Sequence, residues 1–172
     1  MADLGTIDPK KLSDDEYLEL LTELTASEKG LLDVDPTDFA KLVKRSTNDQ
    51  FKALEADPVS AKVVDGIFAR MQERFKPENF RSSRTSVIRW EIGAKAGDRT
   101  YETTGSKQGC EDAEGAQTEE PRCTIKMALP EFLKLASGNG NPPMMFMTRK
   151  LKIDGDVGFA AGVTQVFDIP KA

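Results

Sequence analysis

Two cysteines are the best nucleophiles in this 172-residue chain, and few partners are present to activate them. The sequence contains no histidine, which removes Ser-His and Cys-His dyads, the usual general base and the commonest metal ligand. Cys110 and Cys123 cannot complete a tetrahedral thiolate site by themselves. We interpret them as reduced thiols packed as small apolar groups. A cross-strand disulfide is the alternative if their strands form a tight hairpin.

The carboxylates also show no catalytic pattern. Asp65, Glu73 and Glu78 are not paired in the sequence, so we interpret them as members of a solvated face. The Asp-Gly-Asp segment at 154–156 begins like a calcium loop, but the spacing of later ligands fails, and a helix cap is predicted instead. The sequence therefore predicts no catalytic residue, no metal site and no cofactor.

The most unusual segment is apolar. Residues 144–147 read Met-Met-Phe-Met, after two prolines and before a basic, alternating stretch. Flexible methionine side chains suit a packed core, and they equally suit a pocket that accepts ligands of several shapes. The basic residues Arg149, Lys150 and Lys152 are interpreted as a solvated strand face, with attraction to anionic head groups or to a membrane surface as the alternative.

Composition limits the class of protein. Hydrophobic residues make up 38% of the chain and charged residues 31%, as in globular proteins, and the net charge of −5 argues against nucleic acid as a partner. No apolar run approaches the ~20 residues of a transmembrane helix. The first residues lack the apolar core of a secretory signal, so a cytoplasmic location is expected.

The N-terminal third is predicted to be helical. Ser13 and Glu16 have the spacing of a capping box, and Asp35 or Thr37 can cap a second helix. The two stretches align at an offset of 22 residues as a repeated helix pair. Residues 1–57 are therefore predicted to be a helical extension of two helix-pair repeats. A lid, a dimerisation element and a docking surface are its alternative roles.

Residues 58–172 are predicted to form one further domain. It starts with an amphipathic helix at 58–75, which is followed by a strand in which Ile88, Trp90 and Ile92 share a face. Short strands bounded by glycine predict an antiparallel meander, in which the third and fourth strands form the hairpin that would bring the cysteines together. The strands are expected at 86–95, 99–107, 108–115, 120–129 and 147–156, with helices opened by Pro130 and at 156–168.

Two long segments carry a family resemblance. They read VIRWEIGAK at 87–95 and CTIKMALPEFLKLASGNGNPPMMFMTRKLKIDGDVGFA at 123–160. Together they resemble the sterol carrier protein type-2 family, and the resemblance covers roughly residues 58–168. It implies an α+β fold, in which a five-stranded, mostly antiparallel sheet is covered on one face by helices around an apolar tunnel. It also implies non-catalytic binding and transfer of a fatty acid, fatty acyl-CoA, sterol or phospholipid.

The resemblance assigns the tunnel lining to apolar positions of this chain. The candidate ligand-binding residues are Trp90, Ile92, Ile125, Met127, Phe132, Met144, Phe146, Met147, Phe159, Val163 and Phe167. Glutamines common in relatives are replaced at Pro143 and Thr164, which leaves the head-group preference open. Two other functions are open: an interaction module with a collapsed tunnel, and a subunit that presents substrate to a lipid-metabolising enzyme. A homodimer is also open.

Overall fold

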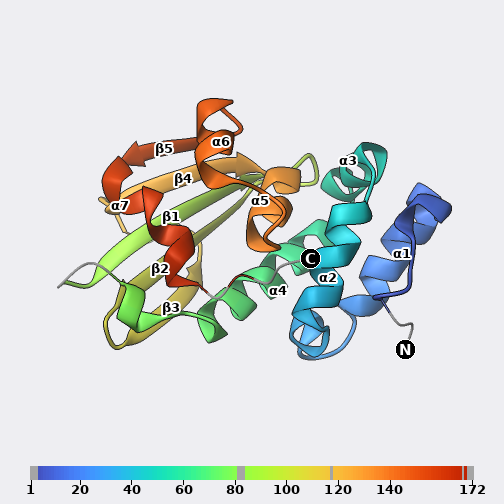
Figure 1. Cartoon of the computed structure of the whole chain (residues 1–172), viewed down its shortest axis with the longest axis horizontal. Coiled ribbons are helices and arrows are strands. Elements are labelled where there is room, and N and C mark those ends of the chain that lie inside the picture. The colour runs from blue at the N-terminus through green and yellow to red at the C-terminus, as the bar shows by residue number, and fades with distance from the viewer. Residues whose placement is uncertain (1–3, 81–83, 117, 168, 170–172) are drawn as a thin grey trace.

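The computed structural model describes residues 4–80, 84–116, 118–167 and 169. Helices from the N-terminal third lie at one end, and a sheet covered by shorter helices lies at the other, with α4 and α5 between them (Figure 1). The helices are α1 (Asp14–Leu24), α2 (Pro36–Arg45), α3 (Asn48–Ala56), α4 (Val59–Glu73), α5 (Leu129–Ala136), α6 (Pro142–Met147) and α7 (Val157–Ala161). The strands are β1 (Ser86–Gly93), β2 (Arg99–Ser106), β3 (Gly109–Glu114), β4 (Cys123–Ala128) and β5 (Leu151–Gly155). The 3-10 turns are η1 (Pro9–Lys11), η2 (Gly30–Asp33), η3 (Pro77–Asn79) and η4 (Val163–Val166).

Local signals begin the N-terminal helices where the sequence predicts. Ser13 Oγ accepts a hydrogen bond from Glu16 N at 3.1 Å, and Ser13 N donates to Glu16 Oε2 at 2.8 Å, which confirms the capping box. Asp35 caps α2 through the amides of Thr37 and Asp38. The predicted repeat is only partly regular, because α2 and α3 form a helix pair whereas α1 is followed by the short turn η2.

The five strands lie in the order β3-β2-β1-β4-β5. Neighbouring strands are antiparallel except for the central pair, β1 and β4, which is parallel. The predicted fold class, a mostly antiparallel five-stranded α+β sheet, is confirmed, but the meander is wrong between β3 and β4. Cys110 lies opposite Gly105, and Cys123 lies opposite Ile88, so that two strands, β2 and β1, separate the strands of the two cysteines. Both are free thiols, so the disulfide alternative is wrong as well.

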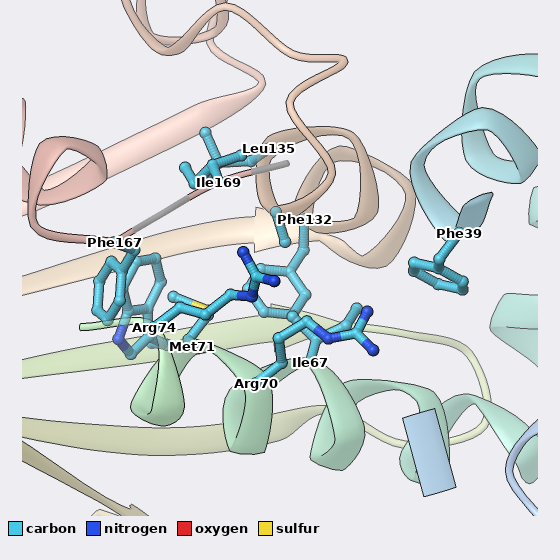
Figure 2. A pocket seen from close by; sticks show the side chains of 11 residues that line it. Phe39, Ile67, Arg70, Met71, Arg74, Phe132, Leu135, Phe167 and Ile169 are labelled. Carbon is cyan, nitrogen blue, oxygen red and sulfur yellow. The ribbon is translucent and has the colours of Figure 1, made fainter. Parts of the chain in front are cut away.

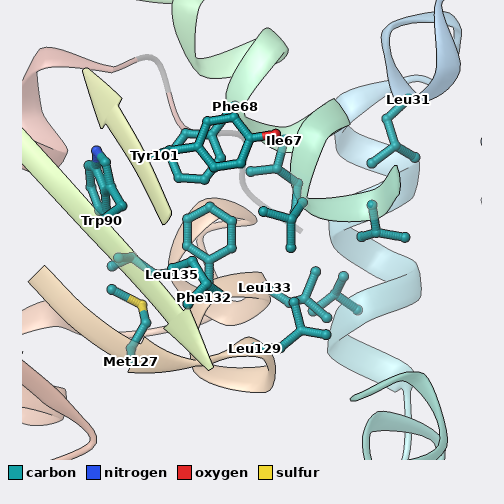
Figure 3. Packing of buried hydrophobic residues seen from close by; sticks show 14 of the residues in the cluster. Leu31, Ile67, Phe68, Trp90, Tyr101, Met127, Leu129, Phe132, Leu133 and Leu135 are labelled. Atoms are coloured by element: carbon teal, nitrogen blue, oxygen red, sulfur yellow. The ribbon is translucent and has the colours of Figure 1, made fainter. Parts of the chain in front are cut away.

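One face of the sheet packs against helices. Its buried apolar side chains are Ile88, Trp90, Ile92, Cys123, Ile125, Met127 and Leu151. Phe68 from α4 is stacked on Tyr101 of β2 and on Phe132 of α5, with ring centroids 4.1 and 5.0 Å apart (Figure 3). This aromatic group joins the sheet to both helices, so α4 and α5 are fixed on the same face.

The N-terminal helices pack directly on α4 and α5, and their apolar side chains continue the core of the sheet region. Gly66 allows the closest approach, since a Cβ atom there would lie 2.8 Å from Leu31 Cβ. Asn139 Nδ2 donates to Ala40 O at 2.9 Å and adds a polar link. The predicted boundary at residue 57 falls between α3 and α4, with packed apolar residues on both sides of it.

Two elements near the C-terminal end differ from the prediction. Residues 142–147 form the helix α6, which was not predicted, and the strand expected from residue 147 begins only at Leu151. The two prolines of α6 lie in its first turn, and Asn141 Oδ1 accepts from Met144 N at 3.1 Å. The predicted helix at 156–168 is shorter, because α7 ends at Ala161 and Gly162 separates it from η4. No described helix is both long and apolar enough to span a bilayer.

Candidate functional site

A first apolar cavity of about 40 Å³ lies between α4, α5 and β1 (Figure 2). Its lining comprises Phe39, Ile67, Arg70, Met71, Arg74, Trp90, Phe132, Leu135, Ala136, Phe167 and Ile169. Most of these side chains are apolar, and they come from segments far apart in the sequence. The charged members are Arg70, which belongs to the last turn of α4, and Arg74, which is the C-cap of the same helix.

The two arginines place positive charge beside this apolar space. They are four residues apart and so extend from the same face of the helix (Figure 2). Arg70 donates to the backbone carbonyls of Leu31 and Val34, which holds its guanidinium group in place. Burial lowers the pKa of Arg70 and the like charge of Arg74 lowers it as well, whereas the carboxylates of Asp35 and Glu73 act in the opposite direction. A carboxylate or phosphate here would offset this repulsion and could accept charge-assisted hydrogen bonds.

A second apolar cavity of about 110 Å³ lies between the sheet and helices α5, α6 and α7. Its lining comprises Trp90, Ile125, Leu135, Pro142, Pro143, Phe146, Leu151, Ile153, Val157, Ala160, Ala161 and Val163. Trp90 and Leu135 belong to both linings. The two cavities are therefore neighbours that share these two side chains as a wall.

The two cavities are small for a lipid. Binding sites for small molecules commonly enclose ~300–1,000 Å³, whereas these measure about 40 and about 110 Å³. Within the described residues the space beneath the helices is therefore divided into separate cavities and is not one open tunnel. A long acyl chain fits only if side chains of the shared wall move.

Six of the predicted ligand-binding residues line these cavities. In the first cavity they are Trp90, Phe132 and Phe167. In the second they are Trp90, Ile125, Phe146 and Val163. They come from β1, β4, α5, α6 and the segment after α7, so the tertiary fold brings together residues that are up to 77 positions apart.

The other five predicted residues lie elsewhere. Phe159 lines a third cavity of about 220 Å³ beside Phe80 and Arg122, which Val163 also lines. Ile92 and Met127 lie at a broad, open groove of about 890 Å³ whose walls carry charges of both signs. Met144 and Met147 line none of these spaces, and their side chains are 57% and 77% exposed.

The sequence analysis missed the contribution of α4 to the site. The sequence predicts an amphipathic helix at 58–75, and Ile67 and Met71 lie on its apolar stripe, but no residue of this helix is among the predicted ligand-binding residues. Arg70 and Arg74 repeat the same four-residue spacing beside that stripe. An apolar stripe flanked by two arginines is the signal that could have identified this wall.

A short hydrogen-bonded chain fixes the indole of the shared wall. Trp90 Nε1 donates to Thr103 Oγ1 at 3.1 Å, and Thr103 Oγ1 donates to Asp112 Oδ1 at 2.7 Å. Asp112 Oδ2 is buried and has no hydrogen-bond partner among the described residues. Burial raises the pKa of Asp112 to about 6. The orientation of Trp90 is therefore connected to a carboxyl group that titrates near neutral pH.

Neither cysteine is activated as a nucleophile. Burial, together with neighbouring carboxylates, raises the pKa of Cys110 to about 12 and that of Cys123 to about 11. Both thiols are therefore protonated near neutral pH, which is the unreactive form. In the part of the chain that the structure describes, no cluster of three or more His, Cys, Asp or Glu side chains could hold a metal ion.

Comparison with known sequences identifies similar proteins. The profile of the SCP-2 sterol transfer family matches residues 66–168, which is more than half of the chain. A curated relative, hydroxysteroid dehydrogenase-like protein 2 of Danio rerio, is 25% identical over 142 residues. The match covers 82% of this chain and 34% of the relative, so the chain spans about a third of that protein's length.

Solved structures show the same fold. The solution structure of palmitated SCP2L2 from Aedes aegypti has a TM-score of 0.50 and 17% identity, over 62% of this chain and 96% of that one. The sec-alkylsulfatase Pisa1 from Pseudomonas sp. has a TM-score of 0.53 and 11% identity, over 98% of this chain and 33% of the sulfatase. At these identities the likeness concerns the fold alone.

Proposed function

The chain belongs to the SCP-2 sterol transfer family, and we propose that it binds a hydrophobic ligand on both sides of Trp90 and carries it without chemical change. Membership of the family supports lipid or sterol binding and transfer in general. Fatty acids, fatty acyl-CoAs, sterols and phospholipids are the candidate ligands. The proposed contacts are Trp90, Ile125, Phe132, Phe146, Val163 and Phe167.

The observation that carries this proposal is the pair of apolar cavities divided by Trp90 and Leu135. Moving these two side chains would join the cavities without breaking a pair of strands. Burying roughly 300–400 Å² of apolar ligand surface gains roughly 8–10 kcal/mol before ordering costs. An off-rotamer side chain costs only about 0.5–1.5 kcal/mol. Moving Trp90 would also break its hydrogen bond to Thr103, a loss of about 1 kcal/mol, so ligand burial still outweighs the rearrangement that it requires.

The arginines of α4 support a ligand with an anionic head group. Arg70 and Arg74 lie at the first cavity, where a carboxylate or phosphate could meet both of them. An acyl chain entering the cavities from this side would keep its head group at the arginines. Fatty acids and acyl-CoAs therefore fit the site better than an uncharged sterol does.

A second function is supported by the comparisons. The whole chain, with its N-terminal helices, corresponds in fold to about a third of an alkylsulfatase, and its curated relative is also a longer protein. This supports a role in presenting an apolar substrate to a lipid-metabolising enzyme. The absence of histidine and the raised thiol pKa values support binding rather than catalysis by this chain.

Trp90 provides the test, because it is the single tryptophan of the chain and lines both cavities. Palmitate, palmitoyl-CoA and cholesterol should be titrated while tryptophan emission is followed, with native mass spectrometry of the gently purified protein alongside. We expect a saturable change and a co-purified lipid. A flat titration with all three and a lipid-free mass would reject the carrier in favour of an interaction module.

The head-group proposal has its own variant. Arg74→Gln should weaken palmitate binding about fivefold, the equivalent of about 1 kcal/mol, because one charged donor is lost. Hexadecanol has the same chain and no charge, so its binding should not change. An equal loss for both ligands would mean that the arginine contributes only packing.

A further inference from the structure

The large apolar side chains that the described residues expose gather at one place. Met144, Phe146 and Met147 on α6 and Val157 at the start of α7 are 57%, 45%, 77% and 45% exposed. We call these four residues the α6 patch. Buried apolar area is the main source of stability, so a compact group of exposed methionine and phenylalanine side chains indicates a contact surface.

The helix that carries this patch is well fixed. Asn141 caps its first turn, Met145 is buried on its inner side, and Thr148 Oγ1 donates to Met144 O at 2.9 Å. Lys150 N donates to Met145 O at 2.9 Å and ties the following turn back to the helix. The outward apolar face is therefore a defined feature of the fold.

Basic side chains follow the patch in the chain and line the neighbouring open groove, which also carries Glu55, Glu91, Asp98 and Glu131. Arg149, Lys150 and Lys152 follow α6 in the chain and are all exposed. None of the three forms an ion pair with a described residue. The nearby carboxylates Asp154 and Asp156 are engaged by Lys126 and Arg122, at 3.3 and 3.1 Å. Positive charge thus accompanies the exposed apolar side chains.

The patch also reaches the second cavity. Phe146 and Val157 line this cavity from α6 and α7, and each is 45% exposed. These two side chains thus have one surface toward the interior and one toward solvent. They form an edge through which an apolar molecule could pass between the cavity and whatever covers the patch.

We propose that the α6 patch inserts into the interfacial layer of an anionic lipid bilayer, with Arg149 and Lys150 on the lipid phosphates. A short helix with exposed apolar residues and adjacent free basic residues suits this layer, where chains and anionic head groups are both within reach. Figure 1 shows α6 at the periphery of the molecule. A second protein fits less well, because four side chains fall short of the ~800 Å² per partner of a standard interface.

The proposal that this surface binds a membrane is argued from the exposed residues alone. A role of the surface in loading the cavity rests, in addition, on the proposed function. On that basis Phe146 and Val157 would face the acyl region when the protein is docked. The ligand would then cross from bilayer to cavity with little exposure to water, which is the costly step for an apolar molecule.

Co-sedimentation with vesicles tests the surface. We expect the full chain to bind vesicles of phosphatidylcholine mixed with phosphatidylglycerol, and to bind pure phosphatidylcholine vesicles about tenfold less. Met144→Ser/Met147→Ser should reduce binding to the mixed vesicles about tenfold. Arg149→Glu/Lys150→Glu should also reduce binding to the mixed vesicles about tenfold. The matched control is Lys10→Glu/Lys11→Glu, which makes the same change of charge on exposed residues of η1 and should leave vesicle binding unchanged.

Two controls separate the possible failures. Sedimentation equilibrium without vesicles would overturn the proposal if the wild type is a dimer, the methionine variant is a monomer and neither binds vesicles. Equal vesicle binding by all variants would overturn it as well. Palmitate titration of Arg149→Glu/Lys150→Glu should match wild type, so a loss of membrane binding with intact ligand binding concerns this surface and not the carrier function.

Discussion

The two sides of α4 and α5 are packed in opposite ways. Toward the N-terminal helices the packing is tight, and a single added methyl group at Gly66 would overlap Leu31. Toward the sheet the same helices leave cavities on both sides of Trp90 and Leu135. At Gly66 the N-terminal contact therefore has no spare volume, whereas the sheet side has volume that a ligand could extend.

This difference indicates that one side of the site is held rigidly and that the other side can move. The N-terminal helices hold α4, and with it Arg70 and Arg74, in a fixed position against the sheet. The opposite edge of the site is covered by α6 and α7, which have six and five residues. Short helices bury little area each, so this cover is the part that can shift at low cost.

The largest expected effect comes from widening the shared wall. Leu135→Ala should lower the free energy of unfolding by about 3 kcal/mol, because a buried side chain is replaced by a void. It should also increase the stabilisation gained on adding palmitate, since the two cavities become one. Thermal melts with and without palmitate measure both quantities.

Leu133→Ala is the matched control on the same helix. Leu133 is buried toward the N-terminal helices and lines neither cavity (Figure 3). It should cost a similar free energy without any gain in the palmitate response. Equal palmitate responses from the two variants would contradict the comparison between the two sides of α5.

The tight side can be tested with a smaller change. Gly66→Ala should lower the free energy of unfolding by about 1–2 kcal/mol in urea titrations, because the new Cβ meets Leu31 Cβ at 2.8 Å. Gly158→Ala in α7 is its counterpart, where the nearest atom would lie at 3.6 Å. That variant should be neutral or slightly stabilising, since alanine favours helix. A stabilising Gly66→Ala would mean that the N-terminal contact has room to spare.

The smallest effect should depend on pH. The pKa of Asp112 is raised from 3.8 to about 6 in the folded protein, so ionisation at neutral pH opposes folding. Asp112→Asn should therefore be more stable than wild type by about 1 kcal/mol at pH 7, a figure reduced for partial exposure. The advantage should shrink as the pH falls through about 6, and it should vanish below about 4, where both states are protonated. Urea melts of wild type and Asp112→Asn at several pH values measure this difference in the free energy of unfolding. A difference that does not change with pH would mean that the pKa of Asp112 is not raised in the folded protein.

Much of the local structure could be predicted because its causes are local. The capping box of Ser13 and Glu16 and the cap at Asp35 involve neighbours in the chain. The alternation of Ile88, Trp90 and Ile92 follows from the pleat of one strand. The order of the strands could not be predicted in the same way, because β4 has the same alternating pattern whether it pairs with β3 or with β1.

The apolar character of the candidate site was predicted from the sequence, but the set of residues that line it was predicted only in part. Apolar residues in the segments that resemble the family were expected to line a tunnel, and six of them meet at the cavities. Met144 and Met147 have the same chemistry and lie three or fewer positions from Phe146, yet they point outward, because a helix turns its residues to different sides. Arg70 and Arg74 were missed because their role depends on what packs opposite α4.

By itself, the sequence determined the starts of α1 and α2, the buried face of the strands and the absence of histidine-based chemistry, since each follows from residue type and short-range spacing. Only the tertiary structure decided that β4 lies parallel to β1, that the space beneath the helices is divided by Trp90 and Leu135, and that α6 turns its methionines outward. These depend on contacts between segments that are distant in the chain, and the same local pattern is compatible with more than one of them.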